Sequence, residues 1–257
     1  MLSTEFRTGS PIWIDLGSPD TQAAAAFYNA VFGWDFVSAG PEAGGYGYFQ
    51  KNGGTVAALG PLTEAEARSA WMTYFRTDDA QATARAVTNA GGSVRAEPMS
   101  IGDAAFAQFT DPQGAQFAVL QSAQGLQRAS EEDTLIWVEL HVGDPETAIG
   151  FYHGLFGWRA QPMQAPGMTY QVLSIAAGDQ QQGSFGGVAP LQDAREAARW
   201  VPYFAVADTD ALVTAVADNG GTILMPAANV PGVGRIAWLA DPAQAVFAVL
   251  RPDPRQS

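Results

Sequence analysis

Short apolar runs rich in β-branched and aromatic residues alternate along this chain with segments whose apolar residues follow helical spacing. The run 12–16 is typical of a strand, and the stretch 26–31 that follows it places apolar residues on one helical face. Asp20 offers a helix-capping carboxylate before this stretch, and Gly33 offers a stop after it. The pattern therefore predicts a strand followed by a helix at the start of the chain.

The same pattern continues through both halves of the chain. A hairpin is expected over 46–59, broken by Gly53-Gly54. The other expected elements are a strand at 71–75, a helix from Asp78 or Asp79 to Gly91-Gly92, strands at 106–109, 116–120 and 136–142, a helix from Asp144, strands within 169–190 and at 200–206, a helix from Asp208 to Gly220-Gly221, and strands at 235–239 and 245–250. Each half reads as two strand–helix–strands units.

The second half of the chain repeats the first. The repeated landmarks are Phe-Tyr-Asn-Ala-Val-Phe-Gly-Trp at 27–34 and Phe-Tyr-His-Gly-Leu-Phe-Gly-Trp at 151–158, Trp-Ile-Asp-Leu at 13–16 and Trp-Val-Glu-Leu at 137–140, and Asp-Pro at 111–112 and 241–242. The offset between copies grows only from 124 to 130 residues, so short loop insertions separate two true copies. We predict a first domain over 8–122, a second over 134–253, and a linker over 123–133.

Three of these features together resemble the vicinal oxygen chelate superfamily, which includes glyoxalase I, bleomycin-resistance proteins and extradiol dioxygenases. They are the Phe-Tyr-x-x-x-Phe-Gly-Trp helix end, its spacing from the preceding strand and from Asp20 or Asp144, and the Asp-Pro-Gln-Gly turn at 111–114, which is degenerate at 241–244. The tandem layout is similar to actinobacterial members labelled glyoxalase-like or hydroxylase. The resemblance implies an α+β fold with two tandem glyoxalase/bleomycin-resistance-type domains, each a pair of βαβββ modules whose curved sheets enclose a cavity.

Composition and charge narrow the classes of partner. With a net charge of −13 and only 13 Lys and Arg residues, the chain is poorly suited to binding nucleic acid. The lack of Cys excludes disulfides, thiolate metal sites and thiol nucleophiles. The first residues have no signal-peptide layout and no apolar run has membrane-spanning length. We expect a cytoplasmic protein, monomer or homodimer, with no nucleic-acid or membrane partner; export without a leader stays open.

The resemblance also implies where metal ligands would stand on the cavity-facing strands. Those positions fall on Trp13 and Trp137, on Met72 and Val201, and on Ala118 and Ala248. None of these side chains holds a hard divalent cation. The chain has two histidines, His141 and His153, and His153 is expected on a helix surface. The sequence therefore predicts no metal of the family type and no other cofactor.

Strand alternation then gives the expected cavity residues. Glu139 and His141 would share a face with Trp137, and a histidine beside a carboxylate is a candidate acid–base pair. The candidate ligand-binding residues are Trp13, Asp15, Met72, Tyr74, Arg76, Trp137, Tyr203 and Arg235. Asp15 and Arg76 would form an ion pair. Each residue also has a structural alternative: buried aromatic side chains are common in cores, and Arg235 could be solvated.

Two functions fit this set of residues, and a third stays open. The first is metal-independent binding of a small aromatic or apolar metabolite in one or both cavities. The alternative is an acid–base enzyme, such as an isomerase, dehydratase or cyclase, that uses Glu139 and His141. A ligand-independent interaction protein is the third.

Overall fold

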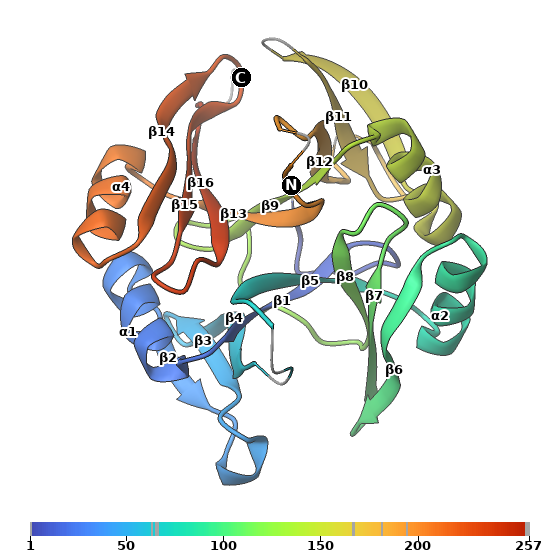
Figure 1. Cartoon of the computed structure of the whole chain (residues 1–257), viewed down its shortest axis with the longest axis horizontal. Helices are drawn as coiled ribbons and strands as arrows, with labels where there is room; N and C mark the ends of the chain where they lie inside the picture. Colours follow the sequence, from blue (N-terminus) through green and yellow to red (C-terminus); the bar gives the residue numbers. More distant parts are fainter. Residues whose placement is uncertain are drawn as a thin grey trace. The chain divides into compact units, whose positions relative to one another are not determined.

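The computed structural model describes residues 2–62, 64, 67–165, 168–180, 182–193 and 195–254. Within them the chain forms two open, mixed eight-stranded sheets and four α-helices (Figure 1). The first sheet has the strand order β2-β3-β4-β1-β5-β8-β7-β6, and the second has the order β10-β11-β12-β9-β13-β16-β15-β14. The predicted α+β fold with two tandem βαβββ pairs is confirmed.

The two copies have matching elements. The first copy comprises β1 (Pro11–Ser18), α1 (Thr21–Phe32), β2 (Asp35–Ser38), a 3-10 turn (Pro41–Ala43), β3 (Gly47–Lys51), β4 (Gly54–Pro61), β5 (Ala70–Arg76), α2 (Ala80–Asn89), β6 (Ser93–Ile101), β7 (Ala104–Thr110) and β8 (Gln116–Gln121). The second comprises β9 (Leu135–Val142), α3 (Pro145–Phe156), β10 (Arg159–Ala165), β11 (Met168–Ser174), β12 (Ser184–Pro190), β13 (Arg199–Ala205), α4 (Thr209–Asp218), β14 (Thr222–Val230), β15 (Gly234–Ala240) and β16 (Val246–Pro252).

The helices begin at the predicted capping residues, and α1 ends at the predicted glycine, whereas α2 and α4 end just before the predicted glycine pairs, with Ala90 and Asn219 as their last capping residues. Asp20 caps α1 by accepting the backbone N–H of Ala23, and Gly33 ends the helix in the left-handed region at φ 66°. Of the two candidates for the start of α2, Asp79 is the capping residue. Among the described residues, no helix combines the length and the apolar character needed to cross a bilayer.

The sequence pattern did not predict four strands, β2, β6, β10 and β14. They are the outermost strands of the two sheets. Their side chains are mostly exposed or half-buried, as in β6 and β14, so the alternation that marks a half-buried strand is weak there.

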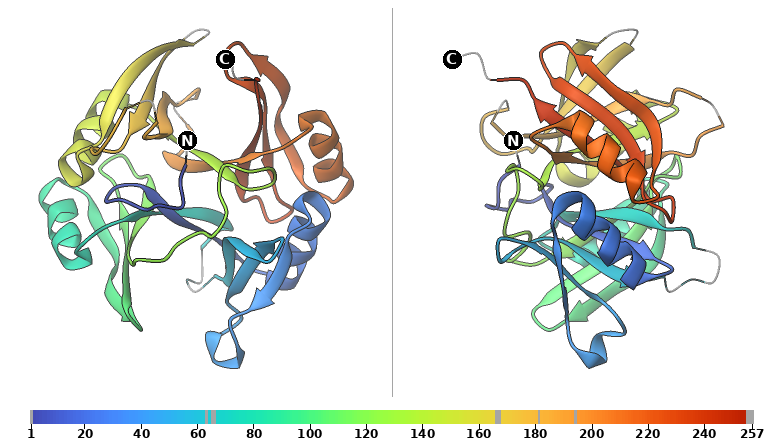
Figure 2. Two further views of the ribbon diagram at one scale, coloured as in Figure 1. Left: turned by 180° about the vertical axis from the view of Figure 1, so that it is seen from behind. Right: turned by 90° about the vertical axis from the view of Figure 1, so that its left-hand side faces the viewer.

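The compact units of the structure differ from the two sequence copies. One unit comprises Met1–Trp13, Met72–Gly125 and Trp137–Val201, and the other comprises Ile14–Trp71, Leu126–Ile136 and Pro202–Ser257. Each unit therefore contains one βαβββ module from each copy, so that α2 contacts α3 in the first unit and α1 contacts α4 in the second (Figure 2). The domain limits predicted above describe the sequence copies and stay a prediction.

The repeated aromatic motif forms the core of each unit. In the first unit, the ring of Trp158 stacks on Tyr152 at a centroid distance of 5.0 Å and meets Phe75 edge-on at 4.8 Å. In the second unit, Trp34 stacks on Tyr28 at 5.7 Å and meets Phe204 edge-on at 5.2 Å. The motif that carries the family resemblance is therefore a packing motif, and each core joins rings from both copies.

A buried hydrogen bond links the aromatic motif of the second copy to the Asp-Pro turn of the first copy. The Tyr152 hydroxyl donates to Asp111 Oδ2 at 3.1 Å and accepts from Trp200 Nε1 at 3.0 Å. Burial raises the pKa of the Asp111 carboxyl, although backbone N–H groups of the turn and the tyrosine partly offset the rise. In the second unit, Tyr28 donates to Asp241 at 3.4 Å in the same arrangement.

Candidate functional site

Strand β9 presents three of the predicted site residues on one face. Val138 and Leu140 are fully buried in the core, and the alternate positions carry Trp137, Glu139 and His141. Glu139 is 8% exposed and His141 is 6% exposed. A buried carboxylate is costly without donors, so its partners decide what it can do.

Glu139 accepts hydrogen bonds at both carboxylate oxygens. His141 Nε2 lies 2.6 Å from Oε1, and the Tyr170 hydroxyl donates to Oε2 at 2.6 Å. The Trp137 indole N–H in turn donates to the Tyr170 oxygen at 2.9 Å. An indole, a phenol, a carboxylate and an imidazole therefore form one hydrogen-bonded chain on the face of β9.

A glycine makes the contact between Tyr170 and Glu139 possible. Tyr170 lies on β11, and β12 separates that strand from β9, with Gly187 paired to Glu139. Neighbouring strands are about 4.8 Å apart, so the phenol must cross the intervening strand to reach the carboxylate. A Cβ atom at Gly187 would lie 2.0 Å from the Tyr170 hydroxyl oxygen. Any residue other than glycine at position 187 would therefore displace the phenol of Tyr170 from its observed position.

A hollow of about 430 Å³ lies beside this network, lined by Gln161, Pro162, Met163, Val172 and Ser184. Met163 is paired with Tyr170, and Gln161 with Val172, across β10 and β11. Directly paired residues share a face, and Val172 is two positions from Tyr170, so the hollow and the hydrogen-bonded chain lie on the same face. Ligand sites commonly have volumes of roughly 300 to 1,000 Å³.

The surroundings of Tyr170 keep its hydroxyl protonated. Burial is the main cause that raises the pKa of Tyr170 well above its ordinary value, and the nearby Glu139 charge raises it further. Burial likewise raises the pKa of Tyr28 and of Tyr152 well above the ordinary value. Their raised pKa values keep these three phenols protonated at neutral pH, where they act as hydrogen-bond donors.

We expect alkaline pH to destabilise the protein through these three phenols. Their raised folded-state pKa means that their contribution to stability is complete below pH about 10, where tyrosines of an unfolded chain ionise, and is lost as pH rises toward the folded-state pKa. The free energy of unfolding should fall by about 4 kcal/mol per pH unit above pH 10, about 1.4 for each phenol. Denaturant unfolding between pH 9 and 11.5 measures this slope.

Tyr170→Phe is the matched variant and should reduce the slope by about a third. Phenolate absorbance gives an independent check, because the three groups should ionise only together with unfolding. Ionisation of all seven tyrosines of the chain in the folded protein would contradict the expectation.

The corresponding face of the first copy is packed with apolar side chains. Tyr74 and Ala118 belong to a buried cluster, and Trp13, Met72 and Phe6 are half-buried against it. Phe6 comes from the segment before β1 and also packs at Gly125, where a Cβ atom would lie 2.6 Å from its ring. The structure thus brings Trp13, Met72 and Tyr74 together in an apolar cluster that the N-terminal segment joins, and their role in ligand binding stays a prediction.

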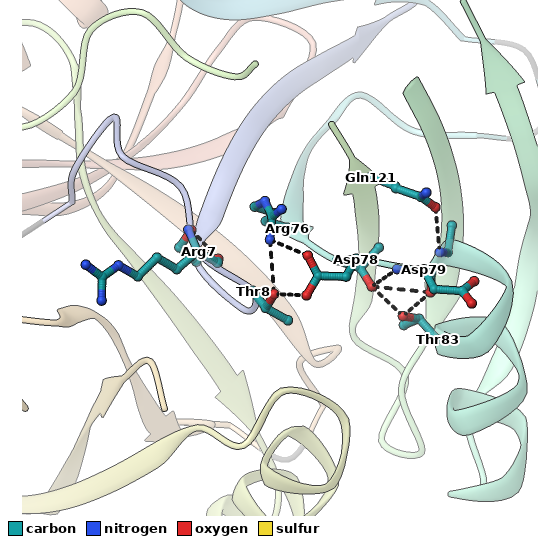
Figure 3. Close-up of polar contacts among 10 residues, drawn as sticks. Arg7, Thr8, Arg76, Asp78, Asp79, Thr83 and Gln121 are labelled. Carbon is teal, nitrogen blue, oxygen red and sulfur yellow. Dashed lines mark hydrogen bonds and ion pairs between the residues drawn. The ribbon is translucent and has the colours of Figure 1, made fainter. Parts of the chain in front are cut away.

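Arg76 lies beside a carboxylate other than the expected one. Its Nη1 contacts Asp78 Oδ1 at 2.7 Å and the Thr8 hydroxyl at 3.0 Å, and Thr8 also bonds to Asp78 (Figure 3). The backbone of Gly9 donates to the carbonyl of Arg76. The ion pair predicted with Asp15 is therefore wrong, because Asp78 is only two residues from Arg76 and Arg76 instead holds the N-terminal segment against β5.

The remaining predicted residues lie in the second unit. Arg235 makes a two-pronged ion pair with Asp210, with contacts of 2.6 and 2.7 Å. Tyr203 accepts a hydrogen bond of 2.9 Å from the indole of Trp238. Asp15 is half-buried and is paired with Ala58 of β4. Their roles in ligand binding stay a prediction.

The residues present do not fit a metal centre of the family type. Among the described residues, no three His, Asp or Glu side chains come together in a group that could hold an ion. The positions implied for ligands carry Trp137, Val201 and Ala248 in the second copy, and Ala248 is paired with Tyr203. The nearest donor set, Glu139 and His141, is hydrogen-bonded to itself and supplies two residues where such centres use three or more.

The sequence reasoning missed Tyr170 and Gly187. The pattern at 169–190 predicts strands but indicates no hydrogen-bond partner for Tyr170. Gly186-Gly187 within the predicted strands was the available signal, because glycine inside a strand often marks a close approach of another group. The sequence alone does not identify that group, because it does not show how β11 and β12 pair with β9.

Comparisons with known proteins agree with this architecture. The family model described as Glyoxalase/Bleomycin resistance protein/Dioxygenase superfamily matches residues 11–119 and 134–249. CFP32 of Mycobacterium bovis, which is named as a glyoxylase, is 37% identical over 98% of both chains. The anthracycline biosynthesis protein DauV of Streptomyces sp. strain C5 is 36% identical over 96% of this chain and 94% of its own.

A solved structure extends the likeness to the fold. The Mn(II)-bound glyoxalase from Novosphingobium aromaticivorans superposes with a TM-score of 0.64 at 17% identity, covering 97% of this chain and 86% of that one. At this identity the likeness concerns the fold alone. With the family model matched in both copies and relatives similar over nearly the whole chain, this protein belongs to the Glyoxalase/Bleomycin resistance protein/Dioxygenase superfamily.

Proposed function

We propose that this protein binds a small, flat aromatic molecule on the face of β9–β12 that carries Glu139, His141 and Tyr170, and that it does so without a metal ion. One observation carries the proposal: a buried carboxylate with two hydrogen-bond partners lies on the same face of the sheet as a hollow of about 430 Å³. Val172, which lines the hollow, is paired with Gly187, and Gly187 is paired with Glu139. Ligand sites combine an apolar lining with a few fixed polar groups, and this face has both.

The lining of the hollow favours an aromatic ligand. Met163 and Val172 supply apolar contact, and the thioether of methionine packs well against ring edges. Tyr170 and Trp137 lie on the same face and supply a phenol and an indole whose polar atoms are held in place by the hydrogen bond between them. The name of DauV, an anthracycline biosynthesis protein, supports an aromatic compound as the ligand class.

A thermal-shift screen of aromatic metabolites, followed by calorimetry on those that stabilise the protein, tests the proposal. Binding should persist when EDTA is added, and divalent cations should not strengthen it. A ligand whose binding is abolished by EDTA and restored by Mn²⁺ or Zn²⁺ would overturn the metal-independent part. A screen without any saturable ligand would overturn binding itself.

A matched pair of charge substitutions locates the site. Met163 is 37% exposed in the hollow, and Met99 is 54% exposed on the outermost strand β6. Met163→Glu should weaken binding at least tenfold, because it places a carboxylate among apolar contacts, whereas Met99→Glu should leave the affinity unchanged. Equal affinities of the two variants would place the ligand elsewhere.

The short contact between His141 and Glu139 favours a second candidate function, acid–base catalysis. A carboxylate that orients an imidazole is a common arrangement for a general base, and such a base contributes about 10² to 10⁴ in rate. If the protein is an enzyme, His141→Ala should still bind the ligand found in the screen. The rate at which the protein catalyses deuterium exchange from solvent into that ligand should fall at least 100-fold. Exchange that is absent in the unmodified protein would reject this candidate.

A further inference from the structure

One cross-strand pair of residues next to the hollow combines a guanidinium group with a hydroxyl group. Arg159 of β10 is paired with Ser174 of β11, and Ser174 is paired on its other side with Ser184 of β12. Gln161 and Val172 form the next pair on the same face, two positions along the strands. Because alternate residues share a face, Arg159 and Ser174 lie on the face of the hollow, one row beyond its lining.

Both side chains have a buried polar atom without a hydrogen-bond partner. Among the described residues five such atoms occur, and two of them, Arg159 Nε and Ser174 Oγ, belong to this single cross-strand pair. Ser174 is 0% exposed. A buried donor that lacks an acceptor costs about 1 to 3 kcal/mol, so two such donors at adjoining positions beside a hollow require an explanation.

The guanidinium of Arg159 is fixed in place by backbone contacts. Its Nη2 donates to the carbonyls of Ile175 at 3.1 Å and Gly178 at 2.9 Å. These bonds set the orientation of the group but leave its charge without a carboxylate partner among the described residues. A fixed cation with a free N–H is suited to an anion, because the side chain is already ordered before binding.

A second guanidinium reaches the same loop. Arg7 Nη1 lies 3.8 Å from the position that a Cβ atom would take at Gly178. Figure 3 shows the Arg7 side chain extending away from the cluster of Thr8, Arg76 and Asp78. The exposed Asp179 follows Gly178 and hydrogen-bonds to the backbone N–H of Gln182. Two guanidinium groups, those of Arg159 and Arg7, therefore reach the loop that contains Gly178, and this loop carries one exposed carboxylate.

We infer that Arg159 and Ser174 form a subsite for a carboxylate group on the aromatic ligand. The Arg159 N–H and the Ser174 hydroxyl would donate to the two carboxylate oxygens, while the ring would lie along Met163 and Val172 toward Tyr170. Both donor atoms are buried, so a ligand would reach them only after the side chains that line the hollow shift. This inference rests on the proposed function and adds the charge and the orientation of the ligand.

Matched pairs of acids and amides test the subsite. The probes are benzoate, 2-naphthoate and 2-anthracenecarboxylate, each compared with its primary carboxamide by calorimetry at constant ionic strength. The unmodified protein should bind the best-fitting acid at least tenfold more tightly than its amide. The amide has nearly the same shape and lacks the charge, so the ratio isolates the contribution of the carboxylate.

Substitutions at the two positions test whether these residues cause the preference for the acid over the amide. Arg159→Gln and Ser174→Ala should each reduce the preference for the acid to threefold or less, with little change in amide affinity. Ser174→Ala should also keep or raise the Tm of the ligand-free protein, since it removes an unpaired hydroxyl. Arg199→Gln is the control, because Arg199 has a similarly buried Nε in the same unit, and it should keep the full preference.

The outcomes separate this inference from the proposed function. Equal binding of an acid and its amide by the unmodified protein would overturn the subsite and leave the binding site in place. A preference that survives in both Arg159→Gln and Ser174→Ala would also overturn it. Failure of all six probes to bind would overturn the proposed function and, with it, the subsite.

Discussion

Asp111→Ala is expected to lower the free energy of unfolding by about 3 kcal/mol. Asp111 is buried; one carboxylate oxygen accepts backbone N–H bonds from Gln113 and Ala115 at 2.9 Å, and the other accepts the Tyr152 hydroxyl. Alanine would leave the buried Tyr152 hydroxyl and the Ala115 N–H without acceptors, each at a cost of about 1 to 3 kcal/mol. The raised pKa of Asp111 shows that burying this carboxyl has a cost of its own, which reduces the net loss. Denaturant unfolding at pH 7 measures the effect.

Three variants show whether the hydrogen bond to the tyrosine is the cause. Tyr152→Phe should cost about 1 to 2 kcal/mol, because it removes the hydroxyl but leaves the turn intact. Asp241→Ala, the equivalent change in the second unit, should cost less than Asp111→Ala, because Tyr28 lies farther from its carboxylate, at 3.4 Å. Asp218→Ala, at an exposed position late in α4, should change stability by less than about 0.5 kcal/mol. A loss below 1 kcal/mol for Asp111→Ala would contradict the expectation.

Gly187→Ala should destabilise the protein by about 3 kcal/mol and abolish binding of the ligand identified in the screen. The new methyl group would occupy the space of the Tyr170 hydroxyl, at 2.0 Å, so the phenol must move away from Glu139. Overpacking of this kind costs about 1 to 3 kcal/mol, and the loss of a donor to the buried carboxylate adds to it. Unfolding and calorimetric titration report the two effects separately.

A second substitution distinguishes displacement of Tyr170 from general strain in β12. In the Tyr170→Ala background the added methyl group meets no hydroxyl, so Gly187→Ala should then cost less than about 1 kcal/mol. Gly154→Ala is the matched control, since its Cβ atom meets nothing within 4 Å in α3, and alanine should stabilise that helix slightly. If Gly187→Ala is equally costly with and without the phenol, the clash assigned here is not its cause.

The exchange of modules between the two copies gives the repeated motif a physical meaning. Tyr152 of the second copy bonds to Asp111 of the first, and Phe75 of the first copy packs on Trp158 of the second. Neither copy therefore completes a core from its own residues. This packing explains why the aromatic residues and the Asp-Pro turn recur in both copies at nearly fixed offsets.

The sequence by itself determined the duplication, the α+β class and the order of the elements, because periodicity, capping residues and glycine stops are local signals. It also placed Glu139 and His141 on one face, since strand alternation requires no knowledge of neighbouring strands. It did not show the four outer strands, whose half-exposed side chains lack a clear alternation. Only the tertiary structure decided the partners: Tyr170 for Glu139, Asp78 for Arg76, and the modules that share a core. These depend on strand register and on contacts between distant segments, which no local pattern in the chain specifies.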